Sequence, residues 1–195
     1  MPDEITIWEQ ARNGDPESFA RIFDEHRDRI YGQALRLVKS GHDAEDITAL
    51  VFLEAWRRRS AVRVVDGSVV AWLLVTTNFV ALNAARTARR HRIALAKTPP
   101  QENQGDHADA ILDRFDATGR ERRLREAFRT LSVQDRNVLT LCVVNDYPLA
   151  GAAAALGIPV GTVKSRLSRA KRRLAALTQD QNSVDTSPRA FGGTN

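Results

Sequence analysis

The chain has 195 residues, enough for one ordinary domain or two small ones, each with a modest core. Its 29 lysine and arginine residues outnumber its 24 acidic residues, and a sequence pI of about 10.0 makes an acidic polymer such as DNA a natural partner. The longest apolar run, residues 69–75, is too short to span a bilayer, and the first residues lack the pattern of a secretory signal. We therefore expect a cytoplasmic protein without membrane insertion.

Helical periodicity dominates the first half of the chain, and no alternating strand pattern is present, so the predicted fold class is all-α. A short helix is expected over residues 5–12. Asp15 and Pro16 form a typical helix start, with the aspartate as N-cap and the proline at the first helical position, and this helix should stop near Ser40. Two further helices are predicted over residues 43–58 and 69–90.

A change of composition predicts two small helical domains joined by a flexible linker. The apolar period is lost after residue 92, and the segment 98–106 is polar and contains two prolines. Helical patterning then resumes, with a start at Ser132 that resembles a capping box. The predicted parts are a first domain at residues 1–92, the linker at 93–119, a second domain at 120–177 and a disordered tail at 178–195.

The most informative segment is residues 149–177. A short alanine-rich helix, a turn at Gly157-Ile158-Pro159 and a basic helix together have the anatomy of a helix-turn-helix. At about 100° per residue, the basic helix separates an apolar side from a polar side. The apolar side holds Val163, Leu167, Ala170, Leu174 and Leu177, the opposite side holds Ser165, Ser168, Arg169 and Arg172, and the flanks hold Lys164, Arg166, Lys171 and Arg173.

Two interpretations of this basic helix are open, a solvated face or a DNA-binding face. Solvated faces normally mix the two signs of charge, because pairs at i and i+4 are then stabilising. Residues 161–174 instead carry six cations and no carboxylate, which favours DNA binding. A second acid-free basic run at residues 86–97 indicates a second contact with DNA.

No constellation of side chains indicates catalysis. The four histidines are scattered, and no glycine-rich phosphate loop is present. Cys142 has no cysteine partner, which excludes an internal disulfide or a cysteine-based zinc cluster, and its apolar surroundings predict a buried small hydrophobe. We therefore expect a protein that is not an enzyme and that uses no cofactor and no metal.

The residues of the helix-turn-helix carry a resemblance to a known family. Residues 156–167, Leu-Gly-Ile-Pro-Val-Gly-Thr-Val-Lys-Ser-Arg-Leu, are very similar to the segment that reads the promoter −35 element in the extracytoplasmic-function (ECF) group of the sigma-70 family. The stretch 43–47 resembles this group's polymerase-binding helix, and the stretch from Trp72 onward resembles its −10 segment. The resemblance covers residues 5–177 and implies a sigma factor that binds core RNA polymerase and promoter DNA, with an anti-sigma factor as a further possible partner.

Helical geometry and this resemblance together define three sets of candidate residues. The −35 set is Thr162, Lys164, Ser165, Arg166, Ser168, Arg169, Arg172 and Arg173. The −10 set is Asn78, Asn83, Arg86, Arg89 and Arg90. The polymerase-binding set is Asp43, Glu45, Asp46, Phe52 and Trp56. Periodicity alone leaves two interpretations of the helix at 43–58, a central core helix or a helix that offers one face to a partner.

The chain departs from the family pattern at several positions. Ala49 and Leu50 stand where relatives usually carry glutamine and an acid, and Gly151 stands where they usually carry an acid. The spacing from Trp72 to Asn78 is about one residue shorter than usual. A second candidate function is a helix-turn-helix regulator of the response-regulator type, which binds DNA without being a polymerase subunit. Such proteins usually add a domain with alternating helices and strands, and residues 1–90 show no such alternation.

Overall fold

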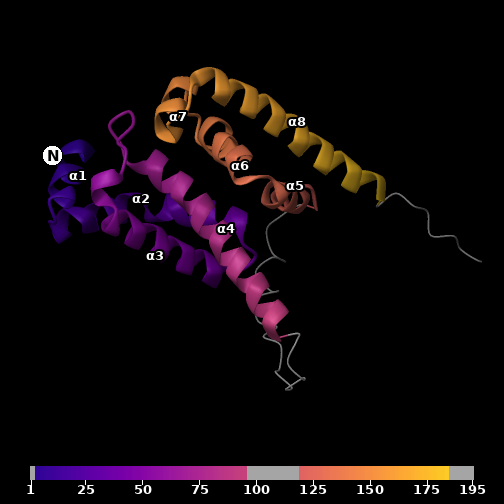
Figure 1. The fold of residues 1–195 in the computed structure, drawn as a ribbon, viewed down its shortest axis with the longest axis horizontal. Helices are drawn as coiled ribbons and strands as arrows, with labels where there is room; N and C mark the ends of the chain where they lie inside the picture. Colours follow the sequence, from indigo (N-terminus) through magenta and orange to yellow (C-terminus); the bar gives the residue numbers. More distant parts are fainter. Residues whose placement is uncertain (1–2, 96–118, 185–195) are drawn as a thin grey trace, which may run out of the picture.

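The structure, a computed structural model, describes residues 3–95 and 119–184, and over these residues it is helical (Figure 1) apart from one isolated bridge between Val65 and Ser68. This confirms the all-α prediction. The elements are α1 (Glu4–Arg12), α2 (Pro16–Leu37), α3 (Gly41–Arg57), η1 (Arg59–Ala61), α4 (Val70–Leu95), α5 (Gly119–Thr130), α6 (Val133–Leu139), the π-helical turn η4 (Thr140–Val144), α7 (Leu149–Leu156) and α8 (Val160–Val184).

Side-chain caps begin the helices that the sequence predicted. The carboxylate of Asp15 accepts a hydrogen bond from the Ser18 amide at 3.0 Å, and the Ser132 hydroxyl accepts one from the Asp135 amide at 3.2 Å. Helix α3 begins at Gly41, two residues before the predicted start at Asp43. The reason is that the Ser40 hydroxyl accepts from the Asp43 amide at 3.2 Å, so Ser40 is the N-cap and Asp43 lies in the first turn.

The first domain consists of α1 to α4, with α2 in contact with the other three helices. Its largest fully buried side chains come from α2, α3 and α4 and include Ile22, Ile30, Val51, Leu73 and Leu74. Each of these helices turns an apolar stripe inward, as their sequence periods predict. The outer faces of α3 and α4 are left to solvent.

The second domain consists of α5 to α8, and α7 with α8 forms the predicted helix-turn-helix. Helix α7 ends at Gly157, which has φ +65° and provides the left-handed residue that turns the chain toward α8. The alanines of α7 allow α8 to approach closely. Val163 and Ala170 on the inner face of α8 are fully buried.

The two domains pack against each other. Helix α4 contacts α6, η4 and α7, and α5 contacts the end of α2. Figure 1 shows the orange helices α6 and α7 beside the upper part of α4. Buried hydrophobic side chains of both domains form one continuous cluster, and the polar residues Asn78 and Thr140 are also fully buried.

Two predicted boundaries are corrected. Helix α4 runs to Leu95, past the predicted linker start at residue 93, and α8 runs to Val184 rather than ending at residue 177. No glycine or proline interrupts the sequence between residues 162 and 184, and the Thr178 hydroxyl donates back to the Leu174 carbonyl at 3.1 Å, as a helical side chain does. The rest of the predicted linker and tail, residues 96–118 and 185–195, lies outside the described residues.

Cys142 was predicted to be buried but is only partly so. It lies in η4, where the neighbouring Val143 and Val144 are exposed, so this end of the apolar stretch faces outward. Burial of part of the side chain raises the pKa of the Cys142 thiol, partly offset by the nearby Lys171. Over residues 3–95 and 119–184, no helix has the length and apolar content needed to cross a membrane.

Candidate nucleic-acid interface

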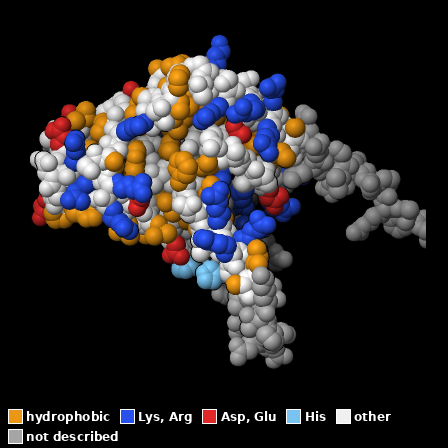
Figure 2. Space-filling view, viewed as in Figure 1, with side chains coloured by type: hydrophobic (Ala, Val, Ile, Leu, Met, Phe, Trp, Pro, Cys, Tyr) orange, Lys and Arg blue, Asp and Glu red, His pale blue; other side chains and the backbone are white. Residues whose placement is uncertain are grey.

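Helix α8 has the two faces that its sequence predicted. Val163 and Ala170 are buried, and Leu167, Leu174 and Leu177 are half-buried against the rest of the second domain. The opposite face is exposed and polar. Its exposed members are Lys164, Ser165, Ser168, Arg169, Arg172 and Arg173. Figure 2 shows lysine and arginine side chains gathered over α8 and over the lower half of α4.

Not every member of the −35 set is equally free. Thr162 and Arg166 are half-buried, and the Ser165 hydroxyl donates to the Thr162 carbonyl at 3.0 Å. Arg169 reaches the second domain's own surface, where its Nη2 lies 3.6 Å from Oδ1 of the buried Asp135. Arg172 is exposed and, like Lys164 and Arg173, makes no hydrogen bond or ion pair with the described residues.

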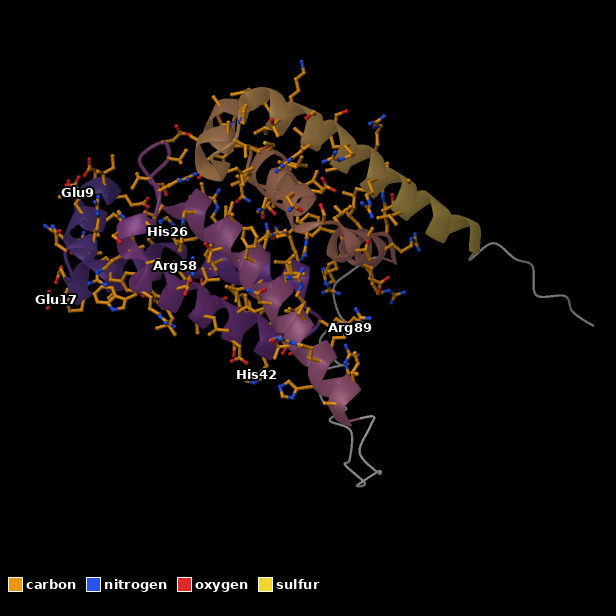
Figure 3. All side chains as sticks on the ribbon, viewed as in Figure 1. Glu9, Glu17, His26, His42, Arg58 and Arg89 are labelled. Atoms are coloured by element: carbon orange, nitrogen blue, oxygen red, sulfur yellow. The ribbon has the colours of Figure 1, made fainter. Side chains whose placement is uncertain are left out.

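The −10 set is divided between two faces of α4. Asn83, Arg86, Arg89 and Arg90 are exposed, and Arg89 is labelled in Figure 3 on the lower half of the helix. Asn83 also lines an open groove between α3 and α4, together with Trp72 and the exposed Phe79. This groove combines an amide, two aromatic rings and nearby cations, which is the chemistry that single-stranded nucleic acid requires.

Asn78 lies on the other face of α4, which packs against the second domain. It is fully buried, and its Nδ2 donates to Asn137 Oδ1 at 2.8 Å. In this arrangement of the domains Asn78 is therefore out of reach of DNA. Helical spacing and the family resemblance placed Asn78 in the −10 set. Neither of them contains information about contacts between the two domains.

The polymerase-binding set also divides into exposed and buried members. Asp43, Glu45 and Asp46 are exposed at the start of α3, where Asp46 lies 3.8 Å from the ring of His42. Phe52 is only 3% exposed and packs against Phe23 with ring centroids 4.8 Å apart, so it lies in the core and not at a polymerase-binding surface, which corrects its place in the predicted set.

Trp56 is half-buried against Phe19, with ring centroids 5.0 Å apart, and Arg59 Cζ lies 4.9 Å from the centroid of the Trp56 ring. Leu50 and Leu53 are 48% and 51% exposed and lie on the same side of α3 as Asp46, although neither was in the predicted polymerase-binding set. Positions 46, 50 and 53 follow the i, i+4, i+7 spacing of one helical face, and this was the signal that could have found them. The exposed face of α3 is thus acidic at its start and apolar further along.

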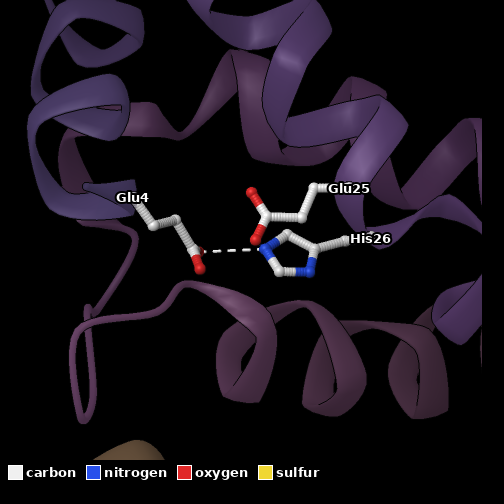
Figure 4. A group of neighbouring side chains, drawn as sticks. All are labelled: Glu4, Glu25 and His26. Atoms are coloured by element: carbon white, nitrogen blue, oxygen red, sulfur yellow. Dashed lines mark hydrogen bonds and ion pairs between the residues drawn. The ribbon is translucent and has the colours of Figure 1, made fainter. Parts of the chain in front are cut away.

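Glu4 joins three elements of the first domain and was not identified from sequence. Its Oε1 lies 2.9 Å from His26 Nε2, with Glu25 beside the pair (Figure 4). The same Oε1 accepts hydrogen bonds from the Ser68 hydroxyl at 2.9 Å and the Val69 amide at 2.8 Å. Burial raises the pKa of Glu4, but the bonds from His26 and Val69 more than offset this, so the pKa is lower than its ordinary value. A carboxylate at this place stabilises the beginning of α4.

Comparisons with known families and structures match these features. Residues 22–91 match sigma-70 region 2, and residues 121–174 match sigma-70 region 4. The chain is 27% identical over 165 residues to the ECF RNA polymerase sigma factor SigK of Mycobacterium bovis, covering 82% of this chain and 85% of that protein. It is 28% identical over 162 residues to the ECF sigma factor SigL of Mycobacterium tuberculosis, covering 82% and 88%.

Two solved structures share the fold. CnrH in complex with the cytosolic domain of CnrY matches with a TM-score of 0.60 at 21% identity, over 91% of this chain and 97% of that chain. The sigma factor RpoE of Bartonella quintana, in complex with the anti-sigma factor NepR, matches with a TM-score of 0.54 at 21% identity, over 84% and 98%.

The match to region 2 also removes the response-regulator alternative, because the first half of the chain is a sigma-factor domain and not a receiver domain. Sigma factors are subunits of RNA polymerase that direct promoter recognition and have no catalytic activity of their own. With region 2 followed by region 4 and relatives of the ECF group along most of its length, the chain belongs to the sigma-70 family as an ECF sigma factor.

Proposed function

We propose that region 2 docks on core RNA polymerase through the exposed face of α3 and engages the −10 element through α4, while α8 of region 4 reads the −35 element. The single observation that carries this assignment is the outward face of α8, where exposed cations and serines lie opposite a packed apolar stripe. A helix of this kind enters the major groove with its polar face and keeps its apolar face on the domain.

The −35 contacts would divide by side-chain chemistry. Arg169 and Arg172 point away from the packed stripe and are suited to bidentate hydrogen bonds with guanine. Lys164 and Arg173 lie on the flanks, where long cationic side chains reach phosphates and hold the helix in register without reading sequence.

The −10 contacts would be made after the strands separate. Unstacking a base costs a few kcal/mol, which contacts to the displaced strand must offset. Asn83 offers both a hydrogen-bond donor and an acceptor, and Phe79 offers an exposed ring for stacking on a base. Arg86 and Arg89 lie along the same helix and would contact the phosphates of the DNA strand.

Docking on the polymerase would use charge at one end of α3 and apolar contact at the other. Asp43, Glu45 and Asp46 provide the acidic start, and Leu50 and Leu53 provide the exposed apolar residues that follow. Complementary charge mainly guides association and orientation, whereas a desolvated apolar contact contributes more to affinity.

The proposed role also implies where the protein acts in the cell and which kind of protein restrains it. Polymerase and promoter are in the cytoplasm, so the protein would act there. The structures of RpoE and CnrH each contain a second protein, an anti-sigma factor in the first case and the cytosolic domain of CnrY in the second. We propose that an anti-sigma factor also restrains this chain.

Run-off transcription tests the central proposal. Purified chain and core polymerase of the source organism are incubated with a library of genomic fragments, and the transcripts are sequenced. We expect discrete start sites that require the chain and that share upstream elements. Transcripts identical with and without the chain would refute the proposal, and the shared elements define the promoter used in the tests below.

A further inference from the structure

Asp135 is a buried carboxylate in the first turn of α6. Its amide donates to the Ser132 hydroxyl, which places the residue at the start of the helix. The residue is only 3% exposed, and its Oδ1 accepts no hydrogen bond from the described residues. Removal of an ionised carboxylate from water is costly unless a cation or hydrogen-bond donors replace the lost hydration. The Asp135 side chain therefore needs a partner.

This partner comes from the exposed polar face of α8. Arg169 Nη2 lies 3.6 Å from Asp135 Oδ1, and no other cation of the described residues forms an ion pair with this carboxylate. Helices α6 and α8 pack against each other, so the pair joins the start of α6 to the face proposed to enter the major groove. The Arg169 side chain is still 62% exposed. One nitrogen of the guanidinium is thus near Asp135, while most of the side chain remains open to a ligand.

Arg169 differs in this respect from other exposed cations of α8. Lys164, Arg172 and Arg173 make no hydrogen bond or ion pair with the described residues. An unrestrained lysine or arginine side chain samples many rotamers and loses this freedom when it binds DNA. The ion pair already restricts Arg169 in the free chain. Arg169 is therefore the cation of this face whose direction is determined by another part of region 4.

We propose that Asp135 is a positioning residue that directs the Arg169 guanidinium toward one guanine of the −35 element and so makes Arg169 a determinant of sequence specificity. This inference rests on the proposed function of α8. A guanidinium carries several N–H donors in a fixed fork. Arg169 can therefore give one N–H to Asp135 and still present a parallel pair of N–H groups to O6 and N7 of guanine.

The pair between Asp135 and Arg169 becomes stronger when α8 enters the groove. In the free chain, water around the exposed arginine screens the two charges, so the pair adds little to stability. DNA excludes this water, and the charges then attract each other more strongly because the local dielectric constant is lower. If Arg169 turned to a phosphate instead, it would leave a buried carboxylate without its cation. The carboxylate thus favours contact with a base over contact with the backbone.

Discrimination between DNA duplexes measures this positioning. The probes are a labelled −35 duplex from a promoter found by run-off transcription and a set of duplexes in which each −35 base pair is replaced in turn. Each duplex is titrated with the holoenzyme, and the ratio of matched to mismatched affinity is the readout. Arg169→Ala identifies the base pair that Arg169 reads, because this ratio falls at that base pair alone.

Asp135→Asn removes the charge and keeps the size of the side chain. We expect the ratio of matched to mismatched affinity to fall about tenfold at the base pair read by Arg169, with unchanged helical circular dichroism. An Arg169 side chain released from Asp135 can contact a phosphate instead of the base. The affinity for mismatched duplexes should therefore be retained, and the slope of log affinity against log salt should become steeper by about one.

A double-mutant cycle separates positioning from general damage to region 4. The effect of Asp135→Asn on discrimination should vanish in an Arg169→Ala background. It should persist in full in an Arg172→Ala background, because Arg172 forms no ion pair with Asp135. General damage would lower the affinity for every duplex in both backgrounds alike, and that result would overturn the positioning role.

A measurement that leaves Asp135 unchanged covers the case in which Asp135→Asn does not fold. Nitrogen relaxation of arginine Nε–H groups in the full chain reports side-chain motion on the picosecond to nanosecond timescale. The signals are assigned by their loss in Arg169→Lys and Arg172→Lys, both at exposed positions. Arg169 should have the higher order parameter, and equal values for the two arginines would contradict the inference.

The inference and the proposed function fail in different ways. If Arg169→Ala binds every duplex as Arg21→Ala does, a variant with the same change of net charge on α2, the contact of Arg169 with the −35 element is wrong and positioning by Asp135 is wrong with it. If Arg169→Ala loses discrimination at one base pair and Asp135→Asn retains it, the −35 contact stands and Asp135 does not position Arg169.

Discussion

Arg172→Ala provides the cleanest test of how α8 reads DNA. The side chain is exposed on the polar face of α8, and it makes no hydrogen bond or ion pair with the described residues. Its removal therefore takes no contact from the folded protein. Any loss of promoter affinity in this variant reports on the DNA contact alone.

The expected loss depends on which part of the DNA the guanidinium contacts. A bidentate contact with a base is worth about 1–3 kcal/mol, which corresponds to about 5- to 150-fold in affinity. A contact with phosphate costs less, affects all sequences alike and reduces the slope of log affinity against log salt by about one. The two cases are therefore distinguished by measuring a matched and a mismatched −35 duplex across a range of salt concentrations.

The assay is fluorescence anisotropy of the holoenzyme on a duplex from an identified promoter. Arg21→Ala is the charge-matched control, because Arg21 is exposed on α2, which has no role in the proposed contacts, and its removal changes the net charge by the same amount. Arg169→Ala is measured in parallel. This substitution also removes an ion pair, in which Arg169 Nη2 lies 3.6 Å from Asp135 Oδ1. The pair is worth less than about 1 kcal/mol because the arginine is exposed. Promoter affinity and salt slope equal to those of Arg21→Ala in both variants would refute the placement of this face in the groove.

Three further changes test the rest of the assignment. Asp46→Arg should weaken co-purification with core polymerase at unchanged circular dichroism, whereas Asp28→Arg, a charge reversal on α2, should not; equal binding by both would count against the α3 face. Asn83→Ala should leave closed-complex binding nearly intact but lower the permanganate reactivity of −10 thymines, and normal reactivity would exclude this residue as a reader. Glu4→Gln should lower the free energy of unfolding at pH 7, because a carboxyl with a lowered pKa stabilises the fold above its ordinary pKa of 4.5. Its contribution is lost as the pH falls through the lower folded value, so the difference between wild type and variant should shrink below pH 4.5; a difference independent of pH would contradict the role of the charge.

Features that depend on neighbouring residues along the chain were predictable. The caps at Asp15 and Ser132, the turn at Gly157 and the two faces of α8 follow from local hydrogen bonding, backbone freedom and a period of about 3.6 residues. The exposure of the α8 cations followed as well, because the apolar stripe determines which face turns inward. Local rules were therefore sufficient to predict which side of α8 is exposed, and the contact of these residues with the −35 element stays a prediction.

Features that depend on contacts between distant residues were not predictable from one sequence. Phe52 lies in the core because Phe19 and Phe23 come from another helix to cover it, and Asn78 is buried because α6 packs on α4. Glu4 lies 22 positions before His26 and 65 before Val69, and neither separation leaves a periodic signal. In each case an amphipathic helix has more than one face that can be covered, and only the tertiary partner selects which face.

Gly151 is a departure from the family pattern that involves both the local structure of α7 and a contact with a distant part of the chain. A larger residue on α7 is compatible with the helix-turn-helix itself, since α7 needs no glycine for its backbone conformation, which is helical there. The constraint comes from region 2, where Asp66 and its loop occupy the space of a side chain at 151. An acid at this position would place its carboxylate against that of Asp66, whereas glycine leaves room for the loop. The glycine therefore answers to a contact with region 2, while the exposed polar face of α8 is set by the second domain alone.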